Sequence, residues 1–87
     1  MGRHTTELEI EFSVATATAE DLLEIGIKYC LGRGVSQNYV EAHKWLNLAA
    51  LKGSESAKQY RCEISAEMTA AEIADAQRQA RALLTIH

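Results

Sequence analysis

The side chains that could do chemistry in this 87-residue chain include two cysteines and three histidines, and their spacing limits what they could do. Cys30 and Cys62 do not form a Cys-x-x-Cys pair, and no histidine lies near either one at the spacing of a zinc site. His4, His43 and His87 are scattered along the chain and are expected at the surface. The sequence therefore predicts no metal site, no cofactor and two reduced, partly buried thiols.

Catalysis or nucleotide binding would need patterns that this sequence does not contain. Gly32 and Gly34 have the spacing of a phosphate-binding loop, but no Gly-Lys-Ser/Thr sequence follows and no strand is expected before them. His43 and Trp45 share one helical turn, with no nucleophile at a fixed spacing from them. The glutamates are predicted on solvated helix faces or in the N-terminal segment. We therefore expect no enzymatic activity.

The charge balance bears on the class of partner. Twelve acidic and nine basic residues give a formal net charge of −3, which offers no basic surface for nucleic acid. Uncharged stretches are far shorter than the roughly 18 to 20 apolar residues that cross a bilayer, and no apolar signal core begins the sequence. The sequence thus predicts a soluble, cytoplasmic protein that binds neither nucleic acid nor membranes.

The elements that must position these residues are predicted to be helices. Apolar residues form 47% of the chain, many of them are alanine, and proline is absent, which favours closely packed helices. Thr18 with Asp21, and Thr69 with Glu72, have the spacing of helix-starting caps. Apolar residues then recur at three- and four-residue intervals. Four antiparallel helices with short connections are expected, over about 19–31, 39–52, 55–68 and 70–84.

The N-terminal segment has a different pattern. Residues 7–14 alternate charged or polar with apolar side chains, so an extended conformation would place Leu8, Ile10, Phe12 and Val14 on one face. No other segment reads as a strand that could pair with it. We therefore expect a flexible tail over residues 1–17 that docks on the helices or on a second copy of the chain.

An ordered series of small and aromatic residues runs through the first two predicted helices. Within residues 22–57, this series closely resembles the Sel-one-like repeat, a relative of the tetratricopeptide repeat. Ile25 stands where that family usually has leucine, and Asn38 where it often has aspartate. The matching signature positions are Gly26, Tyr29, Gly32, Gly34, Val35, Ala42, Trp45, Ala49, Ala50, Gly53 and Ala57.

The resemblance implies an all-α fold of antiparallel hairpins in a right-handed, tetratricopeptide-like superhelix. Residues 18–57 would form one repeat, and residues 54–87 a degenerate second repeat that acts as a C-terminal cap, with its last helix covering the third. Gly26 would let the first two helices approach closely, and Tyr29 and Trp45 would fill the gap between them. Small proteins with this layout are bacterial, so a bacterial source is expected.

The resemblance also implies a function, namely a protein-interaction adaptor whose groove is lined by the first helix of each pair. The partner would be another protein or a peptide segment, bound by Asp21, Glu24 and Lys28 from the first helix and by Tyr60 and Ile64 from the third. A structural role stays open as an alternative, in which the N-terminal tail joins two copies into a weak homo-oligomer.

Overall fold

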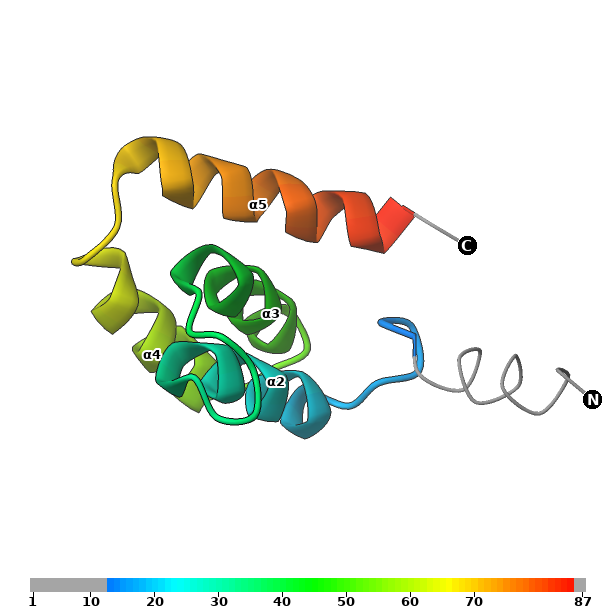
Figure 1. Ribbon diagram of the computed structural model, residues 1–87. Coiled ribbons are helices and arrows are strands. Elements are labelled where there is room, and N and C mark those ends of the chain that lie inside the picture. Colours follow the sequence, from blue (N-terminus) through cyan, green and yellow to red (C-terminus); the bar gives the residue numbers. More distant parts are fainter. Residues whose placement is uncertain (1–12, 86–87) are drawn as a thin grey trace, which may run out of the picture.

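The computed structural model describes residues 13–85, which contain four α-helices and no strand. The predicted all-α class is therefore confirmed for this part of the chain. In Figure 1, α3 lies at the centre, α2 and α4 lie beside it, and α5 crosses above it. Most of the predicted extended segment 7–14 lies outside the described residues. The helices are α2 (Ala19–Leu31), α3 (Tyr39–Leu51), α4 (Glu55–Ser65) and α5 (Ala70–Thr85).

The helices begin where the capping signals predicted. Before α2, the Asp21 backbone N–H donates to Thr18 Oγ1 at 3.0 Å, and the Thr18 N–H donates to Asp21 Oδ2 at 3.1 Å. Thr69 and Glu72 form the same reciprocal pair before α5, at 3.1 and 2.9 Å. Asn38, the residue before the predicted helix 39–52, caps α3 by accepting from the Glu41 N–H at 3.1 Å. Each bond satisfies a backbone donor that the first helical turn leaves unpaired.

The helix ends are predicted less well. Gly32 ends α2 with φ 68°, in the left-handed region that glycine enters without a Cβ clash, as predicted. The third helix, expected to reach Met68, ends three residues earlier at Ser65. A tighter turn follows, in which the Glu67 and Met68 N–H groups donate three residues back. Thr69 needs an extended backbone to cap α5, so the chain must leave the helix before it.

The pair α2 and α3 is packed closely through a glycine. A Cβ added to Gly26 would lie 2.7 Å from Cδ2 of Leu46, which is fully buried. The predicted role of Gly26 is thus confirmed. Tyr29 and Trp45 pack against this core while remaining partly exposed, and the Trp45 indole N–H donates to Glu41 Oε1 at 3.0 Å. Trp45 therefore sits at the edge of the core.

The expectation that the last helix covers the third is wrong. The helix α5 packs on α3, against which Ala76 and Ala80 are buried, whereas α4 packs on α3 and α2. These small side chains let the backbone of α5 come close to α3. As Figure 1 shows, α5 and α4 then diverge from their connection. This divergence leaves part of α3 accessible between them.

One lysine ties the segment before α2 to the end of α3. The Lys52 Nζ donates to the backbone carbonyls of Val14, Ala15 and Ala17, at 3.3 Å for Ala15 and 2.6 Å for Ala17. Ala17 is buried in the core beside this contact. None of the helices within residues 13–85 is both long and apolar enough to cross a membrane.

Candidate functional site

The predicted partner-binding residues of α2 lie on its exposed face. Asp21 is engaged in the cap of the helix with Thr18. Glu24 and Lys28 line a shallow pocket together with Ile27 and Arg33. This pocket is bounded by α2 and the loop that follows it.

The predicted residues of α4 lie elsewhere. Tyr60 is 38% exposed and lines a separate hollow with Ser56, Gln59 and Glu63. Ile64 is only 7% exposed, because α4 turns this side chain into the core. A buried Ile64 cannot contact a partner, so the surface expected between the first and third helices is corrected on this point.

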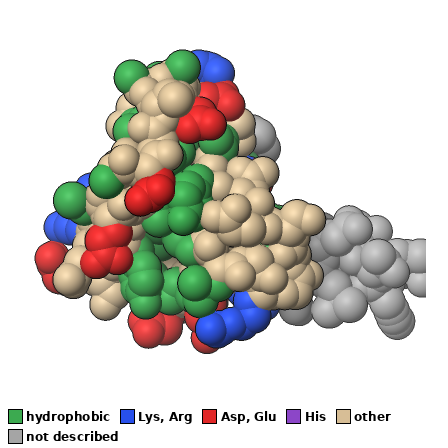
Figure 2. Space-filling view, turned by 60° about the vertical axis from the view of Figure 1, so that its left-hand side comes forward, with side chains coloured by type: hydrophobic (Ala, Val, Ile, Leu, Met, Phe, Trp, Pro, Cys, Tyr) green, Lys and Arg blue, Asp and Glu red, His purple; other side chains and the backbone are tan. Residues whose placement is uncertain are grey.

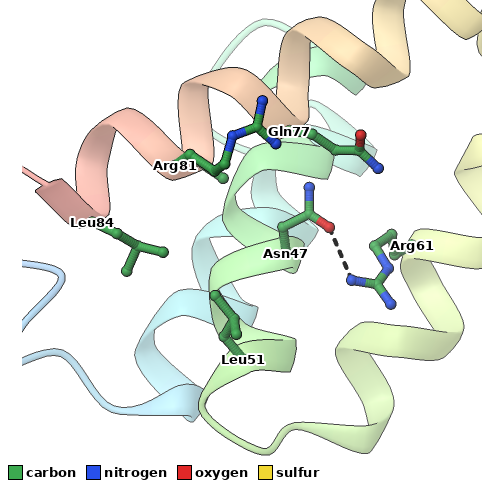
Figure 3. A pocket seen from close by; sticks show the side chains of 7 residues that line it. Asn47, Leu51, Arg61, Gln77, Arg81 and Leu84 are labelled. Carbon is green, nitrogen blue, oxygen red and sulfur yellow. Dashed lines mark hydrogen bonds between the residues drawn. The ribbon is translucent and has the colours of Figure 1, made fainter.

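A different concave site lies between α3, α4 and α5. It has a volume of about 180 Å³ and forms where α4 and α5 diverge over α3. Figure 3 shows the Arg61 side chain reaching from α4 toward Asn47 on α3, with the side chains of α5 on the opposite side. We call this site the α3–α5 groove. Its lining residues are Asn47, Leu51, Arg61, Gln77, Ala80, Arg81 and Leu84.

The groove combines exposed apolar side chains with positive charge. Leu51 is 67% exposed and Leu84 is 41% exposed, although leucine is among the residue types most often buried. Arg61 donates from Nη1 to Asn47 Oδ1 at 2.9 Å, and Arg81 has no hydrogen bond or ion pair with any residue of 13–85. No described lining residue is acidic. An apolar segment that carries a carboxylate matches this chemistry.

Beneath the groove, a buried polar network joins α3 to α4. His43, expected at the surface, is only 2% exposed, so that expectation is wrong. Its Nδ1 lies 3.0 Å from Asn47 Nδ2, and its Nε2 lies 3.0 Å from Ser65 Oγ. Ser65 Oγ donates to the Arg61 carbonyl at 2.7 Å, and Arg61 in turn donates to Asn47. These contacts close a ring that holds the Arg61 guanidinium beside the groove.

The donors and acceptors of this ring assign the state of the histidine. Because the Ser65 hydroxyl donates to a carbonyl, its oxygen must accept from Nε2–H of His43. The Nδ1 atom is then unprotonated and accepts from the Asn47 amide, whose oxygen accepts from Arg61. A proton on Nδ1 would face the amide donor and break this bond. Burial, followed by the positive charge of Arg61, accordingly lowers the pKa of His43.

We expect this histidine to make stability depend on pH. The pKa of His43 in the folded protein lies below its value of about 6.5 in the unfolded chain. Between these two pKa values, the unfolded chain therefore binds more protons than the folded protein. The contribution of neutral His43 to the free energy of unfolding is complete above about pH 6.5 and is lost as the pH falls through the folded-state pKa. Thermal unfolding from pH 7.5 to 5.5 should show a fall in midpoint of a few degrees that His43→Gln reduces. An equal fall in both proteins would contradict the assignment.

The two cysteines do not form an activated site. Cys30 is partly buried and Cys62 is exposed, so only the first matches the expected environment. Burial, followed by the nearby charge of Glu63, raises the pKa of Cys30, which keeps this thiol protonated at neutral pH. In the described range, no three His, Cys, Asp or Glu side chains are grouped to hold a metal ion.

The sequence predicts the helices that form the groove but not the groove itself. The three- and four-residue apolar spacing of the last predicted helix includes Leu84. The signal that could have marked the groove is Leu51, which lies off the recurring apolar positions of its helix. Nothing in the spacing predicted that Arg81 would lie near it.

No family model, curated protein or solved structure matches this chain.

Proposed function

We propose that this chain is a non-catalytic interaction module that binds an apolar, carboxylate-bearing segment of another protein in the α3–α5 groove. The observation that carries the proposal is the pairing of two exposed leucines, Leu51 and Leu84, with Arg61 and Arg81 in one concave site. Exposed apolar surface beside polar groups is typical of interaction sites.

The size of the groove favours a protein segment over a small molecule. Its volume of about 180 Å³ is below the range of roughly 300 to 1,000 Å³ typical of small-molecule sites. One or two side chains of a bound segment would fill it. Because the contact is small, we expect an affinity in the micromolar range or weaker.

The charge of the groove sets the polarity of the partner. The chain carries a net charge of −3, and Figure 2 shows acidic side chains spread along one face, with basic ones toward its edges. The groove differs from this acidic surface, because Arg61 and Arg81 line it and no described lining residue is acidic. A guanidinium binds a carboxylate through paired, charge-assisted hydrogen bonds. The partner should therefore present aspartate or glutamate next to apolar residues.

Two further observations support this class of function. The Gly26 contact between α2 and α3 and the left-handed Gly32 are features that the resemblance to the Sel-one-like repeat implies. We therefore propose that the chain is a member of that bacterial repeat type and that it works in the cytoplasm as an adaptor.

The raised pKa of Cys30 and the hydrogen bonds at both ring nitrogens of His43 argue against nucleophilic catalysis by either side chain.

The proposal predicts which peptides the protein selects. Panning a random peptide library against the full chain should enrich sequences that combine Asp or Glu with Leu, Ile or Phe. Adding one selected peptide should shift the methyl resonances of Leu51 and Leu84. Arg81→Glu should lower its affinity about tenfold, because one attraction becomes a repulsion.

The matched control is Arg33→Glu, the same charge change on an exposed loop residue outside the groove. It should leave the affinity within about twofold. Selection of peptides that lack carboxylates, or shifts confined to Glu24, Lys28 and Tyr60, would show that the groove is not the binding site.

A second candidate function is self-association, which the exposure of Leu51 and Leu84 also favours. A second copy could cover these leucines. Sedimentation from micromolar to millimolar concentration separates the two functions, because only self-association raises the mass of the protein without an added peptide. Arg81→Glu and Leu84→Ser would then reduce the dimer.

A further inference from the structure

The segment that precedes α2 lies at one end of the α3–α5 groove. Lys52, the residue after Leu51, holds the carbonyls of Val14 and Ala17 through its Nζ. In Figures 1 and 3 this segment lies near the end of α5, the end that carries Leu84. The described chain therefore starts near the end of the groove where Leu84 lies.

The residues just before this point have the chemistry that the groove fits. Residues 7–12 read Glu-Leu-Glu-Ile-Glu-Phe, so every carboxylate is followed by an apolar side chain. The groove offers the complementary pairs, with Arg61 and Arg81 as cations and Leu51 and Leu84 as apolar contacts. Like charges at such a contact would repel, so opposite charges set the choice of partner.

We propose that residues 7–12 of the same chain occupy the α3–α5 groove and that a partner protein must displace them. The proposal rests on the proposed function of the groove as a site for acidic, apolar segments. An apolar side chain of the segment enters the groove and covers Leu51 and Leu84, while Arg61 and Arg81 at the rim pair with the glutamates beside it. The segment is thus an internal competitor that weakens binding of the external partner.

The length of the segment and its tether are both compatible with this contact. Six extended residues span roughly 20 Å, whereas Asn47 and Leu51 are one helical turn apart, about 6 Å along α3. Exposed ion pairs contribute only about 0 to 1 kcal/mol each, so they would not hold a separate peptide tightly. A short tether, however, gives an effective concentration in the millimolar range. The anchoring of Val14 by Lys52 shortens this tether further.

The contact can be observed directly in the full chain. In a methyl-labelled sample, nuclear Overhauser effects should connect Leu8 or Ile10 with Leu51 or Leu84. A mixture of labelled and unlabelled chains, observed with an isotope filter, should lose these effects because the contact is intramolecular. Effects that persist across the two chains would overturn the proposal in favour of a second copy as the occupant.

Charge exchange tests the pairing. Arg81→Glu should abolish the effects, and adding Glu9→Arg to it should restore them. Arg33→Glu reverses a charge outside the groove and should change nothing. Effects that survive Arg81→Glu unchanged would show that this arginine does not hold the segment.

A peptide separates failure of this proposal from failure of the proposed function. The probe is a synthetic peptide of sequence Glu-Leu-Glu-Ile-Glu-Phe, added to the wild-type chain and to a variant carrying Glu7→Gln, Glu9→Gln and Glu11→Gln, which removes the charge without attracting the peptide. We expect about tenfold tighter binding to the variant, since its own segment no longer competes. Equal binding to both, with shifts at Leu51 and Leu84, would overturn the internal competitor and leave the groove function standing. A peptide that shifts neither leucine would overturn both.

Discussion

Replacing Leu46 by alanine is expected to lower the free energy of unfolding by about 3 to 4 kcal/mol. Leu46 is fully buried on α3 and meets the closest approach of α2 at Gly26. Truncation removes apolar contacts and leaves a cavity that the two helices cannot close without shifting. Small domains have only about 5 to 15 kcal/mol of stability, so a loss of this size is a large part of the total.

Urea unfolding followed by circular dichroism at 222 nm measures this effect. The control is Leu31→Ala, which makes the same change at an exposed position near the end of α2 and should cost less than about 1 kcal/mol. Equal losses at the two positions would contradict the placement of Leu46 in the core.

Substituting valine for Gly26 is expected to cost about 2 to 3 kcal/mol by overpacking. The new Cβ would stand 2.7 Å from Cδ2 and 2.8 Å from Cγ of Leu46. Leu46 has no room to rotate away because it is fully buried, so α2 and α3 must separate. Valine is a better helix former than glycine, so helix propensity cannot account for this loss. Ala74→Val, which places the same side chain at an exposed position of α5, should cost well under 1 kcal/mol.

The two substitutions also test each other. If Gly26→Val acts through Leu46, the double variant with Leu46→Ala should be at least about 1 kcal/mol more stable than the sum of the single losses predicts. Strict additivity would show that the valine is accommodated in another way.

The starts of the helices were predictable because their signals are local. A capping residue and the acidic side chain three positions later contact each other within one turn, so the spacing of Thr18 and Asp21 determines where α2 begins. The close approach at Gly26 was also predictable, through the resemblance. The end of α4 was missed because it depends on the geometry that the next cap, at Thr69, requires.

The groove could not be predicted because it depends on which helices touch. Periodicity shows that α5 has an apolar face with Ala76 and Ala80, but it does not say whether that face meets α3 or α4. Because α5 packs on α3, Leu51 stays exposed and Arg81 lies near it. The buried His43 was missed for a similar reason, since its partner Ser65 lies 22 residues away on another helix.

The central position of α3 also determines how the molecule opens. Because α2, α4 and α5 all pack on α3, its amide protons should exchange with solvent only when the whole domain unfolds. The helix α5 packs mainly on this one neighbour, so it can detach alone at a lower free-energy cost. Its amides should then exchange faster than those of α3, and a ligand seated against Leu84 and Arg81 should slow them.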